Sequence, residues 1–506
     1  MSDSFILALD QGTTGSTAMI FDASLAVRGR GYREVPQHFP QSGWVEHDPE
    51  DIFSTAIEAG RAAVAEAGIS PTEIAAIGIT NQRETTLLWD RATGQPVSRA
   101  VVWQCRRSAA ICEQWRRVGL APIIREHTGL EVDAYFSASK VRWLLDHIDG
   151  LEARVAVGDI AFGTVDSWLL WRLTNGKTHA TDVTNASRTM FYDIRANTWD
   201  DDLLAAFDIN RRLLGEVLPS SAMFGTAEPE HFGARIPIMG VAGDQQAALF
   251  GQACATPGSA KNTYGTGCFL VMNTGQRAVT SSSRLLTTVG WKLADAPVQY
   301  ALEGSVFSAG SAVQWLRDGL GLIRRAPDIE PLATSVTDNG GVYLVPAFTG
   351  LGAPHWDMYA RGAIVGITRD TRAAHIARAT LESVAYQTRD LIEAMRADAG
   401  HALERLRVDG GMTGNDFLMQ FQADVLGIPV ERPVVVESTA MGAACLAALG
   451  VGMFSSTDEI ARRIRIDRVF EPAMSVDARE TLHAAWQRAV ERSRAWAAQD
   501  PTPAGG

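Results

Sequence analysis

The chain has 506 residues, with 46 lysines and arginines against 58 aspartates and glutamates, and its formal net charge is -12. This length allows two or three domains, and a composition that is 46% hydrophobic and 21% charged is typical of a globular protein with a large core. It excludes intrinsic disorder except at the ends. The acidic balance without a basic run excludes general affinity for nucleic acid or for an anionic membrane.

Lysine is scarce in this sequence. The lysines are Lys140, Lys177, Lys261 and Lys292. An enzyme that handles phosphate would therefore have few of them to use.

The five cysteines are odd in number and include no Cys-x-x-Cys pair, which disfavours a zinc ribbon or a disulfide framework and favours a reducing compartment. The N-terminal segment lacks the basic start of a signal peptide. The most apolar later stretch, 445–454, is shorter than the ~20 residues that span a bilayer. We therefore expect a soluble, cytoplasmic protein without integral membrane association.

Strand-like and helix-like segments alternate along the chain, which predicts a mixed α/β fold. Apolar runs that end in polar residues predict strands at 5–9, 18–21, 74–79 and 236–241.

Three helices are predicted from apolar periodicity and from their end signals. The first begins with Ser137 as its N-cap. The second covers about 372–399 and ends at Gly400, and the third follows Gly414 and ends at Gly427. The small, polar residues after Asp500 are expected to form a mobile tail.

The strand–turn–strand pattern at the N-terminus recurs half a chain later. Residues 261–267 form a second Gly/Thr turn before the apolar segment 268–272. Two related halves that face each other across a cleft would explain this spacing, although any Gly-rich hairpin has a similar pattern.

The sequence has no Walker-type phosphate loop. Residues 176–178, Gly-Lys-Thr, match its second half, but Trp171 occupies the position of its first glycine. We therefore expect Lys177 to lie on a solvated turn.

Three Gly/Thr turns can bind phosphate without lysine. In the first, residues 10–14 (Asp-Gln-Gly-Thr-Thr), glycine lets the backbone approach closely while N–H groups and two hydroxyls donate hydrogen bonds. Asp10 can hold Mg²⁺ there, directly or through water. An ordinary hairpin with an Asp-capped turn is the alternative interpretation. The other two turns are 263–267 and 410–411.

Two polar clusters follow apolar strands. Asp244 precedes a predicted helix and can accept a proton from an attacking hydroxyl. Arg83 and Glu84 can hydrogen-bond a polyol, one as donor and the other as acceptor. The alternatives are a helix-capping aspartate for the first cluster and a surface ion pair for the second.

These motifs belong to a series that runs almost end to end. The series is LALDQGTTGS (7–16), GWVEHDP (43–49), ITNQRETT (79–86), VVWQCRR (101–107), TNASRTM (184–190), AGDQQAALFGQ (242–252), AKNTYGTGCF (260–269), PAFTGLGAPHWD (346–357) and RVDGGMTGNDFLMQ (407–420). In this order the motifs resemble those of the FGGY carbohydrate kinases. NQRE, WQCRR and GDQQAALFGQ resemble the branch of that family that acts on glycerol rather than the pentulose kinases.

The resemblance implies two actin-like, ribonuclease-H-like ATPase domains on either side of a central cleft. The first, 1–250, would hold the glycerol site, the first phosphate turn and the catalytic base. The second, 251–498, would hold the nucleotide site, and 499–506 would be a flexible tail. The implied reaction is ATP-dependent phosphorylation of glycerol to sn-glycerol 3-phosphate, by direct in-line transfer with Mg²⁺.

The resemblance also implies individual roles. Glycerol would be bound by Arg83, Glu84, Tyr135, Asp244 and Gln245, with Trp103 and Phe269 against its carbon backbone. Asp244 would be the general base and Asp10 would organise Mg²⁺. The residues implied to contact ATP are Thr13, Thr14, Gly15, Thr266, Gly267, Gly310, Gln314, Gly411 and Asn415.

The sequence departs from the family at Thr17, where the first phosphate turn usually has an arginine. The segment 228–235 takes the place of the family's regulatory loop but lacks the glycine run with which some members bind a sugar bisphosphate. We expect its His231 to be solvated, the alternative being the histidine that is phosphorylated in other members. Family habit predicts a homodimer or homotetramer.

Two alternatives to this function remain. One is a kinase of the same fold for another small polyol or ketose. The other, of a different class, is an actin-like interaction protein driven by nucleotide.

Overall fold

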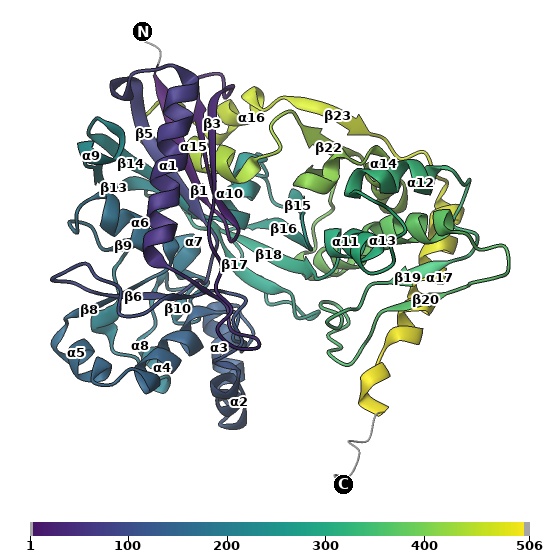
Figure 1. Ribbon diagram of the computed structural model, residues 1–506, viewed down its shortest axis with the longest axis horizontal. Helices are drawn as coiled ribbons and strands as arrows, with labels where there is room; N and C mark the ends of the chain where they lie inside the picture. The colour runs from purple at the N-terminus through teal and green to yellow at the C-terminus, as the bar shows by residue number, and fades with distance from the viewer. Residues whose placement is uncertain (1–3, 500–506) are drawn as a thin grey trace.

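The computed structural model describes residues 4–499 and has two large sheets, one in each lobe of the molecule (Figure 1). The six-stranded sheet consists, in spatial order, of β13 (Ser221–Ala227), β14 (Ile236–Gly243), β5 (Ile74–Asn81), β1 (Phe5–Gln11), β2 (Gly15–Phe21) and β3 (Val27–Glu34). The seven-stranded sheet consists of β17 (Leu286–Trp291), β18 (Gln299–Val306), β16 (Cys268–Gly275), β15 (Ala260–Tyr264), β21 (Leu406–Asp409), β22 (Val430–Pro433) and β23 (Ile466–Phe470).

The two sheets repeat one pairing pattern. β1 is antiparallel to β2 and parallel to β5, which is parallel to β14. In the same way β15 is antiparallel to β16 and parallel to β21, which is parallel to β22. The predicted echo of the first hairpin is therefore a repeat of the whole sheet, and the mixed α/β fold is confirmed.

Helices surround both sheets. Those before residue 252 are α1 (Pro49–Ala67), α2 (Ala109–Arg117), α3 (Ala121–Thr128), α4 (Ser137–His147), α5 (Leu151–Val157), α6 (Val165–Leu173), α7 (Val183–Ala186), α8 (Asp201–Ala206), α9 (Pro229–Phe232) and α10 (Asp244–Gly251). Those after it are α11 (Gly310–Asp318), α12 (Ile329–Thr334), α13 (Ala373–Ala399), α14 (Asp416–Leu426), α15 (Ser438–Gly450), α16 (Thr457–Arg463) and α17 (Val476–Ser493).

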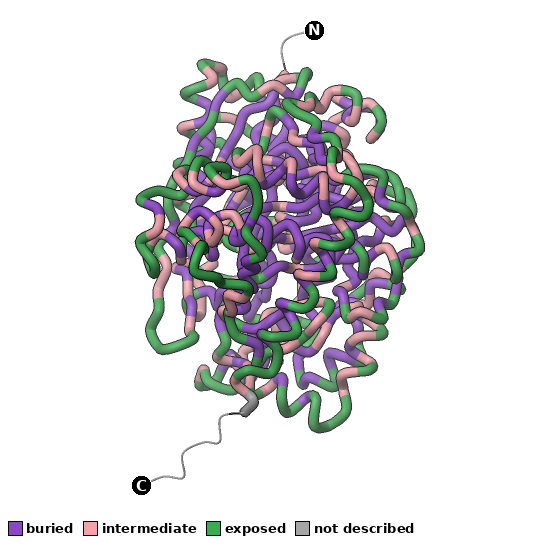
Figure 2. Tube along the Cα trace, turned by 90° about the vertical axis from the view of Figure 1, so that its right-hand side faces the viewer, coloured by how far each residue is buried: buried purple, intermediate pink, exposed green. Residues whose placement is uncertain are grey.

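Short strand pairs complete the fold. They are β4 (Glu46–His47) with β7 (Ala100–Val101), β6 (Leu87–Asp90) with β8 (Ile160–Gly163), β9 (Ala180–Asp182) with β12 (Glu216–Leu218), β10 (Tyr192–Asp193) with β11 (Thr198–Trp199), and β19 (Tyr343–Val345) with β20 (Ala363–Val365). Buried residues fill the centre of the molecule (Figure 2). Among residues 4–499 no helix is both long and apolar enough to cross a membrane.

Helix α15 packs on the six-stranded sheet, although it begins at Ser438 and the last strand of that sheet ends at Gly243 (Figure 1). Glycines make this close approach possible. A Cβ at Gly78 of β5 would lie 2.1 Å from the carbonyl oxygen of Ala443, and one at Gly442 would lie 1.8 Å from that of Ala247 in α10. The helix thereby joins the first sheet to the segment that carries Asp244.

The predicted strands are present as β1, β2, β5 and β14, and the two later predicted helices as α13 and α14. Both helices end at glycines in the left-handed conformation, Gly400 and Gly427, as expected. The prediction that Ser137 is an N-cap is wrong. Phe136 holds that position, and the Ser137 hydroxyl donates instead to the carbonyl oxygen of Glu84, at 3.1 Å.

Two surface predictions have different outcomes. Lys177 lies exposed and pairs with Glu228, as a solvated turn predicts. The expectation that His231 is solvated is wrong, because its ring is buried in α9, edge-on to Phe53 with 5.5 Å between ring centroids. The predicted tail after Asp500 lies outside the described residues.

Candidate active site

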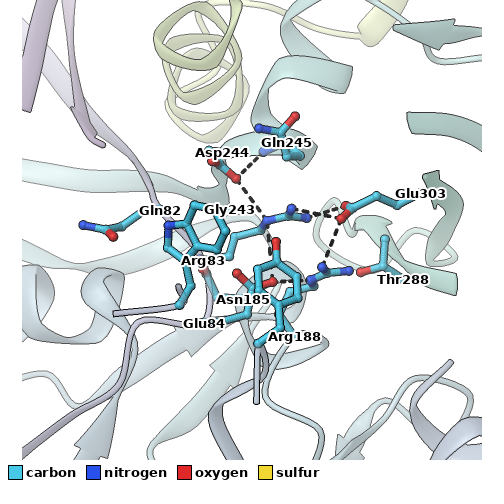
Figure 3. Close-up of polar contacts among 12 residues, drawn as sticks. Gln82, Arg83, Glu84, Asn185, Arg188, Gly243, Asp244, Gln245, Thr288 and Glu303 are labelled. Carbon is cyan, nitrogen blue, oxygen red and sulfur yellow. Dashed lines mark hydrogen bonds and ion pairs between the residues drawn. The ribbon is translucent and has the colours of Figure 1, made fainter. Parts of the chain in front are cut away.

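Four ionisable side chains form a buried network between the two halves of the chain (Figure 3). Arg83 donates to both carboxylate oxygens of Glu303, at 2.6 and 3.1 Å. Arg188 donates to Glu84 at 2.6 Å and to Glu303 at 3.0 Å. Since Glu303 lies on β18 and the other three belong to the N-terminal half, the network joins the halves.

Two arginines keep Glu303 ionised. Burial alone would raise the pKa of its carboxyl group, but the charges of Arg188 and Arg83 outweigh burial and lower this pKa to about 2. For Glu84, burial is the larger effect, and the pKa is raised despite the same two arginines.

The backbone of Glu84 is strained. Its φ is 62°, a left-handed conformation that residues with a Cβ adopt at a cost of about 1–3 kcal/mol. Its carbonyl oxygen accepts hydrogen bonds from the hydroxyls of Thr86 and Ser137, each at 3.1 Å. These contacts and the pairing with Arg188 hold the residue in place.

Asp244 is the first residue of α10, directly after β14. One of its oxygens lies 3.0 Å from Nε of Arg83, and its side chain is 30% exposed. Gly243 makes this pairing possible, because a Cβ there would lie 2.7 Å from the side chain of Arg83. The Gly243 N–H donates to the hydroxyl of Thr184 at 2.8 Å. Asp244 is thus oriented by a buried cation but remains open on one side.

Two aromatic rings lie beside the network. Trp103 meets Tyr135 edge-on with 5.5 Å between centroids, and its indole N–H donates to the hydroxyl of Thr13 at 2.9 Å. Lys140, which is fully buried, donates to the carbonyl oxygens of Ala134 and Tyr135, both at 2.6 Å, and to a third at 3.0 Å. The Trp103 ring therefore contacts the turn at residues 10–14.

Gln245 and Phe269 are brought together by a second buried lysine. The ammonium of Lys261 donates to Oε1 of Gln245, to the hydroxyl of Thr263 at 2.7 Å and to the carbonyl oxygen of Phe269 at 3.3 Å. This contact connects α10 to the hairpin of β15 and β16.

Asp10 is the last residue but one of β1 and lies beside the start of α15. Burial raises its pKa to about 7, the hydroxyl of Thr439 lowers it by donating to the carboxylate, and the charges of Asp244 and Glu437 raise it. Thr17 is the cross-strand partner of Asp10. Thr14 is exposed, and Gly15 begins β2.

The second Gly/Thr turn, 263–267, packs against the start of α11. The N–H of Gly310 donates to the carbonyl oxygen of Gly265, and that of Ser311 to the carbonyl oxygen of Thr266, both at 3.0 Å. Thr266 is exposed, and Gly267 must lack a side chain because a Cβ would lie 2.3 Å from the Val306 oxygen.

The remaining predicted nucleotide residues lie nearby in the C-terminal half. A Cβ on Gly310 would touch the sulfur of Met412, which neighbours Gly411 in a short 3-10 turn. Asn415 caps α14 by accepting the N–H of Leu418 at 2.8 Å, and Gln314 lies exposed on α11.

The structure decides one alternative and adds residues that the sequence did not suggest. Arg83 and Glu84 are buried, so their interpretation as a surface ion pair is wrong. Arg188, Glu303 and Lys261 were missed. Glu303 had one signal in the sequence, as a lone charge inside the apolar strand 299–306.

One group of potential metal ligands lies elsewhere. Within residues 4–499, His127, Asp193 and Asp200 are the three such side chains that come within 4.8 Å of one another. Their atoms already have partners: Asp200 accepts from His127 at 2.6 Å and from the N–H of Leu203 at 3.0 Å. This group does not belong to the site described above.

Comparison with known proteins identifies the family. The sequence matches the N-terminal domain of the FGGY family of carbohydrate kinases over residues 5–251 and the C-terminal domain over residues 260–451. The chain belongs to the FGGY family of carbohydrate kinases. Its two-sheet fold is the fold of that family.

Relatives of this FGGY kinase match over nearly its whole length. It is 57% identical to the glycerol kinase of Symbiobacterium thermophilum, over 99% of this chain and all of that one. It is 58% identical to the glycerol kinase of Aromatoleum aromaticum, over 98% of this chain and all of that one.

A solved structure also matches closely. The glycerol kinase of Plasmodium falciparum, solved with ADP, superposes with a TM-score of 0.91 at 36% identity, over 97% of this chain and 98% of that one. A gluconate kinase from Lactobacillus acidophilus has a TM-score of 0.87 at 20% identity and shows the fold alone.

Proposed function

We propose that this FGGY kinase transfers the γ-phosphoryl group of ATP to glycerol and releases sn-glycerol 3-phosphate. The observation that supports this most is the setting of Asp244, whose open carboxylate is 3.0 Å from a buried arginine and follows a strand that ends at the site. Relatives at 57 and 58% identity over nearly the whole chain are named glycerol kinases, which supports glycerol as the acceptor.

In the proposed mechanism Asp244 takes the proton of glycerol's terminal hydroxyl as its oxygen attacks the γ-phosphorus. Arg83 orients this carboxylate and donates to a second hydroxyl, while Glu84 accepts from glycerol. Transfer is direct and in line, so positioning and charge stabilisation do most of the work.

Other contacts would define the polyol and exclude water. Tyr135 and Gln245 contribute hydrogen bonds, and Trp103 and Phe269 lie against the carbon backbone. The edge-on contact of Trp103 with Tyr135 supports one continuous wall. Excluding water from this site suppresses hydrolysis of ATP.

ATP would bind on the turns of both halves. We propose that its phosphates contact Thr13, Thr14, Gly15, Thr266 and Gly267, and that the rest of the nucleotide lies along Gly310, Gln314, Gly411 and Asn415. The packing of the second turn against the start of α11 supports this, because helix-start N–H groups favour anions. The match to a relative solved with ADP supports ATP as the phosphoryl donor.

A magnesium ion fits beside Asp10. Burial raises the pKa of this carboxyl to about 7, and the charges of Asp244 and Glu437 act in the same direction, so a cation would relieve an unfavourable ionisation. Carboxylate oxygens suit Mg²⁺, which usually keeps water and phosphate oxygens as its other ligands. When bound, the ion would neutralise charge on the phosphoryl group in transfer.

We propose that the chain divides at residues 250 and 251, with 1–250 and 251–498 as its domains. In support, the six-stranded sheet lies entirely before residue 244 and the seven-stranded sheet after residue 259. The five cysteines are all buried and unpaired, which suits a reducing cytoplasm. Assembly as a homodimer or homotetramer stays a prediction.

The test is a coupled assay of ADP release with and without glycerol, repeated with dihydroxyacetone and D-xylulose. We expect release to depend on an acceptor and kcat/KM to be highest for glycerol. A higher kcat/KM for D-xylulose or dihydroxyacetone would assign the enzyme to another substrate. Equal release without any acceptor would contradict a kinase of this class.

A further inference from the structure

Lys261 is fully buried, and its hydrogen bonds are unusual for a lysine next to a phosphate site. An ammonium group has three N–H donors and no acceptor, and its burial is costly unless all three are used. Here the acceptors are Oε1 of Gln245, the hydroxyl of Thr263 and the carbonyl oxygen of Phe269. All three acceptors are neutral, and none of the three N–H groups is left for a phosphate.

The contact spans the two halves of the molecule. Lys261 lies on β15 of the seven-stranded sheet, whereas Gln245 is the second residue of α10, directly after the last strand of the six-stranded sheet. Figure 3 shows Gln245 next to Asp244 on this helix. The lysine therefore reaches from the nucleotide half to a residue of the polyol half.

The contact also fixes which end of the glutamine amide is free. A glutamine side chain has one accepting end, Oε1, and one donating end, Nε2 with two hydrogens. Because an ammonium can only donate, Oε1 must face Lys261, and Nε2 must point away from it. Among residues 4–499 no hydrogen bond joins this Nε2 to another residue, so neither of its hydrogens has a partner within the described part of the protein.

We infer that Lys261 is a positioning residue that orients the Gln245 amide, so that its Nε2 donates to a hydroxyl oxygen of glycerol. This inference rests on the proposed function, and it adds the polarity of one substrate contact and the residue that sets it. Because the orienting group belongs to the opposite half, glycerol binding depends on the two halves being in contact.

The pKa of Lys261 is lowered overall, although nearby carboxylates oppose this shift. Burial lowers the pKa of the ammonium, but the carboxylates of Asp409, Asp244 and Glu303 raise it, while Arg83 lowers it. The same network that holds Arg83 therefore also favours the donating form of Lys261.

The first test is a double-mutant cycle on glycerol affinity, measured by calorimetry. Lys261→Met keeps the length of the side chain and removes its donors, so the Kd for glycerol should rise about tenfold, the effect of one hydrogen bond of about 1.4 kcal/mol. Gln245→Ala should cost about the same. In the double variant the Kd should rise no further, since the lysine acts through the glutamine. The Kd for ATP should change by less than about twofold throughout.

Lys177→Met is the matched control, because Lys177 is exposed and pairs with Glu228 on the surface. It should leave both affinities unchanged. A double variant whose effect is the product of the single effects, about a hundredfold, would overturn the inference.

Gln245→Glu tests the polarity and does not depend on how well Lys261→Met folds. A glutamate keeps an acceptor for Lys261, and an ion pair between them stabilises the contact, but the donating Nε2 is gone. We expect glycerol affinity to fall as much as in Gln245→Ala, with the melting temperature of wild type or higher. Wild-type affinity in this variant would overturn the inference.

The two proposals fail in different ways. A wild-type protein that binds no glycerol would contradict the proposed function, and the inference with it. The role of Lys261 alone would be contradicted if the wild-type protein binds glycerol and one of two further results is found. Either the effects of Lys261→Met and Gln245→Ala on the Kd for glycerol multiply in the double variant, or Gln245→Glu binds glycerol with wild-type affinity.

Discussion

The buried charges around Arg83 show how individual residues set the chemistry of this site. Glu303 and Asp244 both pair with Arg83, but Glu303 is buried while Asp244 is 30% exposed. The guanidinium of Arg83 therefore pairs with a buried carboxylate, that of Glu303, and with an accessible one, that of Asp244. Of these two carboxylates, Asp244 is the one that is open to a proton from a substrate hydroxyl.

Thr17 gives a prediction at the residue scale. It faces Asp10 across β1 and β2, in the position where the family usually has an arginine. In Thr17→Arg a cation would reach the first phosphate turn, and charge-assisted hydrogen bonds to phosphate are stronger than neutral ones. We expect the apparent KM for ATP to fall about fivefold, or ~1 kcal/mol, in steady-state assays at saturating glycerol.

Thr17→Gln is the control for this prediction, since it adds length without charge and should leave the KM for ATP close to that of wild type. An unchanged or raised KM in Thr17→Arg would mean that the missing charge is not what limits nucleotide affinity.

At this scale the sequence predicted residues that stand in polar clusters at strand ends. Arg83, Glu84 and Asp244 were predicted in this way, and the structure brings their side chains together. Arg188 and Glu303 were missed because their importance comes from tertiary contacts. Glu303 is a single charge in an apolar strand, Arg188 is the one charge in the polar segment 184–189, and nothing local shows that they meet. Lys261 was also missed, because among its hydrogen-bond partners Thr263 alone lies close to it in the sequence.

At the element scale, α15 depends on small residues. Gly442→Ala would place a methyl group 1.8 Å from the backbone oxygen of Ala247, so α10 or α15 must shift. Overpacking of this kind costs about 1–3 kcal/mol, more than the gain of up to ~1 kcal/mol from the better helix propensity of alanine. We expect a net loss of about 1–2 kcal/mol in the free energy of unfolding, measured with denaturant.

Gly414→Ala is the matched control for Gly442→Ala. A Cβ there meets nothing within 4 Å, and its φ is not in the left-handed region. Its stability should equal or exceed that of wild type. If Gly442→Ala were as stable as this control, the close packing of α15 would not be a constraint.

Helix and strand positions were mostly predictable because apolar periodicity and terminal glycines are local signals. The end of α13 at Gly400 is an example. Ser137 shows where such reasoning fails: serine is a common N-cap, but here its hydroxyl satisfies the carbonyl oxygen of the strained Glu84 instead. That partner is fifty-three residues away in the sequence.

At the scale of the whole molecule, two sheets with the same strand-pairing pattern lie in the two halves that a buried ionic network joins. The sequence suggested the repeat from its two Gly/Thr turns. It did not suggest that α15 of the C-terminal half packs on the N-terminal sheet, because the closeness of Gly78 to Ala443 arises only in the folded chain.

Glu303 makes the stability of this arrangement depend on pH. Its pKa falls from 4.5 to about 2 on folding, so its stabilising contribution is complete above pH 4.5 and is lost as the pH falls toward 2. Between pH 6 and pH 3, wild type should lose about 2 kcal/mol more of its free energy of unfolding than Glu303→Gln does. Denaturant unfolding at each pH measures the difference.

Glu113→Gln is the control, because Glu113 lies exposed on α2. A plot of its free energy of unfolding against pH should run parallel to that of wild type. Parallel curves for wild type and Glu303→Gln would contradict the proposed role of Glu303 as an ionised link between the halves.

The most direct test of the account is phosphoryl transfer in Asp244→Asn. Asparagine keeps the size of the side chain and cannot take up a proton, and general-base catalysis contributes about 10²–10⁴-fold. We predict that kcat for glycerol falls by about 10³-fold or more, with the Kd for ATP within about twofold of wild type. Transfer near the wild-type rate would contradict Asp244 as the base, and with it the mechanism proposed for this kinase.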